Sequence, residues 1–130
     1  MNRRNFLSAT GAAGALFAAP LSRRMKPAIF SKHLQFLQGE DLALAAAEIG
    51  FDGIDLTVRK GGHVEPERVA QDLPRLVKII RAHGLEVPMV TSEILDDRTP
   101  HAEAVLQTIS ALEIRNYRWG GFKYGPTPIA

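Results

Sequence analysis

The fold of this chain is decided by one stretch, Gly50-Phe51-Asp52-Gly53-Ile54-Asp55-Leu56-Thr57-Val58. Its second half alternates apolar residues at 54, 56 and 58 with polar residues at 55 and 57, the pattern of a strand with one apolar and one polar face. A strand buried between two layers of helices would be apolar on both faces. The alternation therefore favours a sheet that helices cover on one face only.

Three amphipathic helices flank this strand in the sequence. Apolar residues recur at three- and four-residue spacing in three sets, namely Leu42, Ala45, Ala46 and Ile49, then Leu73, Leu76, Val77 and Ile80, then Ala102, Val105, Leu106 and Ile109. Gly50 and Gly84 suit the left-handed position that ends the first two helices. Asp72 and Thr99 are the predicted N-caps of the second and third helices.

Each helix is followed by a strand-like run, and a further run precedes the first helix. The predicted strands cover residues 28–31, 51–58, 85–91 and 115–119. The junctions at 50, 84 and 114 recur after 34 and then 30 residues, which predicts a β-α-β-α-β-α-β order. Strands joined by crossover helices run parallel, with right-handed crossovers.

Two folds accommodate four parallel strands: part of a (β/α)8 barrel and an open, doubly wound sheet. No strand is followed by GxGxxG or GxxxxGK[ST], so the usual phosphate-binding reasons for an open sheet are missing. With the one-sided strand, this favours an α/β half barrel of about four βα units. A complete barrel takes about 250 residues. We therefore expect residues 27–130 to be the N-terminal half of a longer barrel, unstable as a monomer because two sheet edges are open.

The composition restricts the classes of function. The chain has 130 residues and no Cys, which excludes disulfide scaffolds, Cys-ligated zinc modules and thiol nucleophiles. Residues 1–26 contain five basic residues and no acid, whereas residues 27–130 contain 11 basic and 14 acidic residues. A body of net negative charge has no electrostatic reason to bind phosphate backbones, so no nucleic-acid partner is expected.

The basic N-terminus has the layout of an export signal. Arg3-Arg4-Asn5-Phe6-Leu7 precedes an Ala- and Gly-rich stretch over residues 8–21, which is too short to span a bilayer. The Arg-Arg-x-Phe-Leu string resembles a bacterial twin-arginine signal. We expect residues 1–26 to direct the folded protein to the periplasm through the twin-arginine export machinery.

Four phrases of the sequence resemble one family of barrels. They are Gly-Phe-Asp-Gly-Ile-Asp-Leu at 50–56, the loop and turn over 57–69, Gly-Leu-Glu-Val-Pro-Met at 84–89 and Tyr-Arg-Trp-Gly at 117–120. In this order and spacing they are similar to the sugar phosphate isomerase/epimerase family, the xylose isomerase-like barrels, in an exported bacterial branch. The resemblance covers residues 27–125.

The resemblance implies metal-dependent isomerisation or epimerisation of a small sugar or sugar phosphate. A divalent metal (Mn, Mg, Co or Zn) would polarise a carbonyl while two carboxylates move a proton at the adjacent carbon. The family carries its metal ligands on later strands, so no ligand or catalytic residue transfers to this segment, and this chain alone should be inactive. Three alternatives stay open: an inosose-dehydratase-like lyase, an endonuclease IV-like nuclease, which the acidic body disfavours, and an exported carbohydrate-binding protein without catalysis.

Six residues are candidates for substrate binding: His63, His33, Glu93, Trp119, Asp55 and Lys123. Asp55 falls mid-strand on the predicted inner face of the barrel, and the other five fall near its predicted mouth. In the second βα loop, Arg59 and Glu65 are expected to form an ion pair. His83 and His101 are expected to serve helix ends at the surface. The four His residues have no metal-ligand spacing.

Overall fold

The computed structural model describes residues 25–121 and residue 125. The export signal predicted over residues 1–26 lies outside this range except for its last two residues, and Lys123 lies outside it as well. Within residues 25–121, no helix is long and apolar enough to cross a bilayer.

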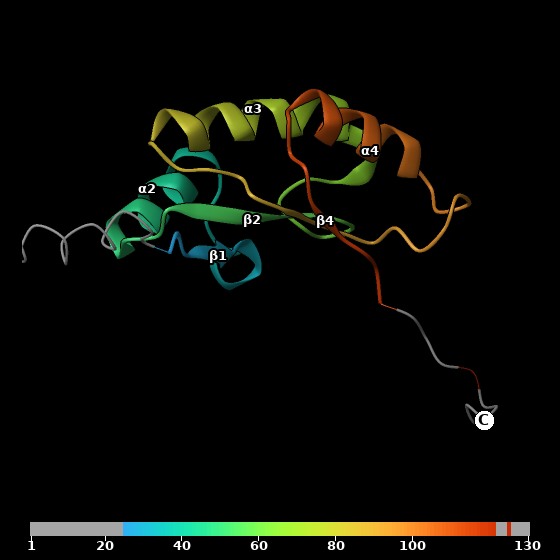
Figure 1. The fold of residues 1–130 in the computed structure, drawn as a ribbon, viewed down its shortest axis with the longest axis horizontal. Helices are drawn as coiled ribbons and strands as arrows, with labels where there is room; N and C mark the ends of the chain where they lie inside the picture. Colours follow the sequence, from blue (N-terminus) through green and yellow to red (C-terminus); the bar gives the residue numbers. More distant parts are fainter. Residues whose placement is uncertain (1–24, 122–124, 126–130) are drawn as a thin grey trace, which may run out of the picture.

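Strands and helices alternate along the chain, as Figure 1 shows. Their order is β1 (Ala28–Phe30), the short 3₁₀ helix η2 (Ser31–Leu34), α2 (Gly39–Ile49), β2 (Gly53–Val58), the 3₁₀ helix η3 (Pro66–Arg68), α3 (Val69–Ala82), β3 (Val90–Ser92), α4 (Ala102–Ala111) and β4 (Tyr117–Arg118). All neighbouring strands pair in parallel, in the order β1-β2-β3-β4. The predicted α/β fold with four parallel strands and alternating βα units is confirmed.

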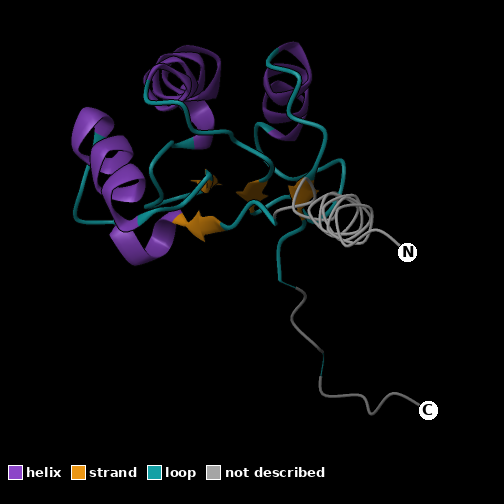
Figure 2. Cartoon of the chain, turned by 60° about the vertical axis from the view of Figure 1, so that its left-hand side comes forward, coloured by secondary structure: helices purple, strands orange, loops and turns teal. Residues whose placement is uncertain are grey.

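Within residues 25–121, the three α-helices lie on one side of the sheet (Figures 1 and 2). The strand order follows the sequence without a reversal. A doubly wound sheet reverses its strand order and so places helices on both faces. The described part of the chain therefore does not have the strand order of a doubly wound sheet, and its α-helices cover one face only.

A single apolar core fills the space between helices and sheet. The strands contribute Ile54, Leu56, Val58 and Val90, all fully buried. The helices contribute chiefly Leu42, Ala46, Leu73, Val77, Ile80, Val105 and Ile109. Burial of these side chains on one face of each strand explains the alternation seen in the sequence, because the polar residues between them point to the other face.

The first two helices end as predicted. Gly50 has a φ of 100° and Gly84 a φ of 74°, both in the left-handed region that favours glycine. At the end of α2, the Phe51 amide donates to the Ala46 carbonyl at 3.1 Å, the contact expected of a glycine-terminated helix. The chain then turns directly into β2.

Both predicted N-caps are wrong. Helix α3 begins at Val69, three residues before Asp72, and the Asp72 carboxylate instead pairs with Arg68 at 2.8 Å. Helix α4 begins at Ala102 after His101, which has a left-handed φ of 63°. Thr99 closes the preceding turn, where its Oγ1 accepts the Leu95 amide at 3.0 Å.

All four predicted strands are shorter in the structure, the last two most of all, and the predicted apolar stripes are exposed in two places. β3 begins only at Val90, because Pro88 has no amide hydrogen with which to continue the ladder. β4 covers only Tyr117 and Arg118. Ile49 and Leu106, expected in the core, are 59% and 37% exposed, whereas the α3 stripe is buried throughout.

Candidate functional site

The face of the sheet that points away from the helices carries a row of polar residues. Because side chains alternate along a strand, Asp55 and Thr57 point away from the buried Ile54, Leu56 and Val58. The strand register then aligns Thr57 with Thr91, and Thr91 with Arg118, on this same face. Phe30 aligns with Asp55. We call these five residues, Phe30, Asp55, Thr57, Thr91 and Arg118, the polar face.

Asp55 and Thr91 form the centre of the polar face. The Thr91 hydroxyl lies 3.0 and 3.1 Å from the two carboxylate oxygens of Asp55 and donates to them. Partial burial raises the pKa of the Asp55 carboxyl, while the Thr91 hydrogen bond and the positive charge of Arg118 act to lower that pKa. A half-buried carboxylate in the electric field of a guanidinium group can accept hydrogen bonds from a polar ligand.

Replacing Asp55 with asparagine tests this electrostatic arrangement. A raised pKa in the folded state means that protonated Asp55 favours folding at low pH and that this contribution is lost as the pH rises through the raised pKa. An asparagine side chain stays neutral at every pH between about 4 and 7. Asp55→Asn is therefore expected to raise the midpoint of thermal unfolding at pH 7, with a smaller gain near pH 4. Thermal melts across this range measure it, with Asp97→Asn in an exposed loop as the control. A gain in the thermal midpoint that did not depend on pH would contradict the raised pKa of Asp55.

His63 is held by the fold through both ring nitrogens. Its Nε2 lies 3.0 Å from the Leu37 carbonyl, which can only accept, so Nε2 carries the proton. Its Nδ1 then accepts from the Thr57 hydroxyl at 3.2 Å, and its backbone amide donates to that hydroxyl oxygen at 2.9 Å. The buried Ser31 Oγ joins the same network at 3.2 Å from Thr57 Oγ1. His63 thus ties the segment after β1 to the loop after β2.

His33 lies at the carboxyl end of β1. Its ring meets the Phe30 ring edge to face, with centroids 5.9 Å apart. The Arg59 guanidinium also lies over the Phe30 ring, 5.9 Å from its centroid, in a cation–π contact. Together these residues form an aromatic and basic rim beside the polar face.

Glu93 lies at the same end of the sheet as His63. Its Oε2 accepts the backbone amide of Lys60 at 3.3 Å, which joins the end of β3 to the loop after β2. The predicted Arg59–Glu65 ion pair is wrong for these two described residues. Glu65 accepts the Gly61 amide at 2.9 Å, while Arg59 stacks on Phe30.

Trp119 is on the opposite side of the sheet from Asp55. Arg118 belongs to the polar face, so the residues on either side of it, Tyr117 and Trp119, point toward the helices. Both line a groove with Leu106 of α4. We call the end of the sheet at which the strands finish, their carboxyl ends, the carboxyl rim. The structure therefore places Asp55 on the polar face and His33, His63 and Glu93 at the carboxyl rim. It places Trp119 on the other face of the sheet, toward the helices.

Arg118 is the residue that the sequence interpretation missed. Arg118 lies between two aromatic residues, and this alternation indicates a strand in which the arginine points to one face and the aromatic residues to the other. That signal does not say which face the arginine occupies. Only the register between β3 and β4 shows that it aligns with Thr91 and acts on Asp55.

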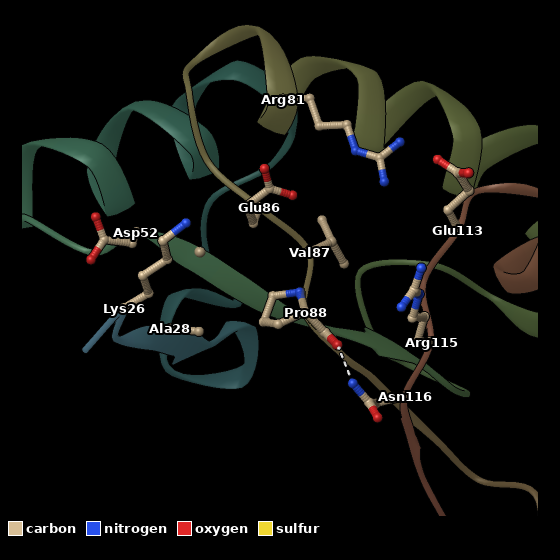
Figure 3. Close-up of a pocket in the computed structure, with 11 residues that line it drawn as sticks. Lys26, Ala28, Asp52, Arg81, Glu86, Val87, Pro88, Glu113, Arg115 and Asn116 are labelled. Atoms are coloured by element: carbon tan, nitrogen blue, oxygen red, sulfur yellow. Dashed lines mark hydrogen bonds between the residues drawn. The ribbon is translucent and has the colours of Figure 1, made fainter. Parts of the chain in front are cut away.

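A separate pocket of about 320 Å³ opens at the amino ends of the strands (Figure 3). Its charged lining is mixed, with Lys26, Arg81 and Arg115 against Asp52, Glu86 and Glu113. The Asn116 side chain donates to the Pro88 carbonyl across it at 3.2 Å. This pocket lies at the end of the sheet opposite the carboxyl rim, and its balanced charges favour no one class of ligand.

Among residues 25–121, no three His, Asp or Glu side chains gather closely enough to hold a metal ion. His83 instead contacts Glu40 at 3.2 Å and the Ile79 carbonyl at 3.1 Å at the end of α3. The resemblance assigns the metal ligands to later strands, so no metal site is assigned to the described residues.

Comparison of the sequence with models of known protein families gives no match, and a search of curated proteins finds no relative.

Proposed function

We propose that residues 27–130 form the N-terminal half of a (β/α)8 barrel that binds a small sugar or sugar phosphate for metal-dependent isomerisation or epimerisation. The observation that carries this proposal is the polar face. It is the side of the parallel sheet that points away from the α-helices of residues 25–121, with the Asp55–Thr91 pair at its centre and Arg118 on the edge strand β4. In a barrel this side becomes the interior, whose carboxyl end holds the active site.

The winding of the sheet supports the barrel. Right-handed crossovers between strands in sequential order keep every helix on one side, and a barrel is this arrangement continued to eight strands. His33 and Glu93 follow β1 and β3, and His63 lies in the loop after β2. All three therefore belong to the carboxyl end, where barrel enzymes bind their substrates.

The chemistry of these groups suits a polyol. The Asp55 carboxylate accepts hydrogen bonds from hydroxyl groups, and Arg118 and Arg59 supply donors for hydroxyl or phosphate oxygens. The Phe30 ring offers an apolar surface for sugar C–H groups. The proposal assigns the divalent metal and the proton-transferring carboxylates to strands beyond the described residues, and no chemical step is derived for this chain.

Sugar binding by the 130-residue chain tests the proposal. Ligand-observed NMR with a panel of aldoses, ketoses and their phosphates should show binding that Asp55→Ala weakens about ten-fold or more. Asp97→Ala, in an exposed loop, is the matched control and should bind as the parent does. The bound sugar should remain unconverted when Mn²⁺ is added.

Two results would overturn parts of this proposal. Failure of the folded chain to bind any member of the panel would remove the sugar site. Conversion of the sugar by this chain alone would show that the metal and catalytic groups do not lie on other strands.

The proposal includes export through the twin-arginine machinery. The support is the Arg3-Arg4 pair before a short, weakly apolar stretch. Changing both arginines to lysine keeps the charge but removes the guanidinium groups. We expect this double variant to lose almost all periplasmic protein in a bacterial host, as judged by fractionation and immunoblotting. An unchanged periplasmic yield would refute the signal.

A further inference from the structure

Arg59 carries a positive charge that no acidic residue balances in the described part of the chain. Its side chain is partly buried, and its guanidinium carbon lies 5.9 Å from the centroid of the Phe30 ring. The ion pairs found within residues 25–121 both involve helix residues, and neither includes Arg59. Burial of a charge is costly unless a partner compensates it, and the cation–π contact supplies only part of that compensation. A half-buried guanidinium group in this state is suited to an anionic group of a ligand.

The carboxylates on this side of the sheet hold neutral donors instead. Glu65 and Glu93 accept backbone amides of the loop after β2, and Asp55 accepts the Thr91 hydroxyl. The two arginines of this region therefore differ in their electrostatic surroundings. Arg118 acts on the Asp55 carboxylate, whereas Arg59 has no ion-pair partner among residues 25–121.

The loop after β2 holds Arg59 in a fixed position. Every backbone amide from Arg59 to Val64 donates a hydrogen bond within this structure. The acceptors are, in order, the Val64 carbonyl, Glu93 Oε2, Glu65 Oε1, the Arg59 carbonyl, Thr57 Oγ1 and the Thr57 carbonyl. The Gln35 side chain, from the segment after β1, also donates to the Gly61 carbonyl. Because the loop is joined to the segments after β1 and β3, little further ordering is needed when a ligand binds to Arg59.

The same hydrogen bonds indicate which class of anion fits. Proteins commonly hold phosphate groups with several backbone amides, at a helix N-terminus or in a glycine-rich loop. Gly61 and Gly62 lie in this loop, but the amides from residue 59 to residue 64 already have acceptors. One guanidinium group can instead match a carboxylate, whose two oxygens accept two parallel hydrogen bonds in one plane. The loop therefore favours a carboxylate over a phosphate.

We infer that the ligand of the polar face is a sugar acid, whose carboxylate pairs with Arg59 while its hydroxyl groups donate to Asp55. Phe30 connects the two positions, because it aligns with Asp55 in the sheet register and its ring lies under the Arg59 guanidinium. The inference rests on the proposed function and narrows it: the small sugar is retained, and a carboxylate on that sugar is specified.

Binding of matched ligands to the 130-residue chain tests the inference. Glucose, galactose and mannose each provide a series of the neutral sugar, its uronate, its uronamide and its 6-phosphate, which differ only at the last carbon. Ligand-observed NMR titrations should give at least one uronate a Kd about ten-fold or more below those of its neutral sugar and its uronamide. The 6-phosphate of that series should bind more weakly than the uronate.

Variants of the parent chain assign this preference to Arg59. Arg59→Gln should weaken binding of the uronate about ten-fold or more and binding of the neutral sugar much less. Arg59→Lys keeps the charge without the planar pair of donors and should recover only part of the affinity. Arg75→Gln removes an equal charge from the exposed surface of α3 and is the matched control, which should bind as the parent does. If Arg59→Gln does not fold, the comparison of uronate with uronamide in the parent chain still decides.

Equal affinity for a uronate and its uronamide, or a uronate preference that a folded Arg59→Gln retains, would overturn the inference. Tighter binding of the 6-phosphate than of the uronate would overturn it as well. In these cases, neutral-sugar binding that Asp55→Ala weakens would still support the proposed function. If the folded chain binds no sugar of any kind, the proposed function fails and the inference fails with it.

Discussion

Replacing Leu73 with alanine is expected to lower the free energy of unfolding by about 2–5 kcal/mol. Leu73 is fully buried on α3, the middle helix, in the single core between helices and sheet. The substitution removes apolar contacts and leaves a cavity that neighbouring α2 and α4 prevent from collapsing. Urea unfolding followed by circular dichroism measures the change, at one fixed protein concentration so that self-association does not alter the comparison.

The matched control is Leu44→Ala, the same substitution on the neighbouring helix α2. Leu44 is 47% exposed, so its truncation should change the free energy of unfolding by about 0.5 kcal/mol or less. Equal losses for the two variants would contradict the packing described for α3, since a loosely packed core would not distinguish them.

The α3 stripe was predictable because that helix has neighbours on both sides. Apolar periodicity reports which face of a helix points to the core, and Leu73, Leu76, Val77 and Ile80 are all buried. The same rule overstates burial in α2 and α4. Ile49 and Leu106 sit at the side of their stripes that faces an open end of the sheet, and periodicity carries no information about whether another element lies there.

The polar face was predictable in part. The alternation at 54–58 indicated that Asp55 points away from the helices, and the structure confirms that orientation. The contribution of Arg118 depends on the pairing of β3 with β4, which are separated by a helix in the sequence. Register is set by packing across strands, and a slip of one residue would exchange Arg118 with Trp119. The sequence therefore predicted which face of the sheet Asp55 occupies, but it did not predict that Trp119 lies on the other face.

His63 shows the same limit for a loop residue. Its position after Gly61 and Gly62 suggested a side chain free to meet a ligand. In the structure its ring contacts Thr57 and the Leu37 carbonyl, a residue 26 positions earlier in the chain. Such a long-range partner leaves no local trace in the sequence.

Replacing Gly53 with alanine is the second substitution with a large expected effect. A Cβ at this position would lie 2.8 Å from the Glu86 carbonyl oxygen and 3.2 Å from Cδ of Pro88. Neither neighbour can move easily, because the Glu86 carbonyl accepts the Ile54 amide at 2.9 Å and Pro88 is a rigid ring in the same segment. We expect Gly53→Ala to lower the free energy of unfolding by about 1–3 kcal/mol, the usual cost of forcing an extra group into a packed interior.

Gly121→Ala provides the control for this prediction, because a Cβ there would meet no heavy atom within 4 Å. Its free energy of unfolding should match that of the parent within about 0.5 kcal/mol. Hydrogen exchange should locate the damage in Gly53→Ala, with faster exchange at the Ile54 and Glu86 amides that join β2 to the segment before β3. If these amides stay protected and stability is unchanged, the close approach that puts Gly53 at the start of β2 is wrong, and with it the register that sets Asp55 on the polar face.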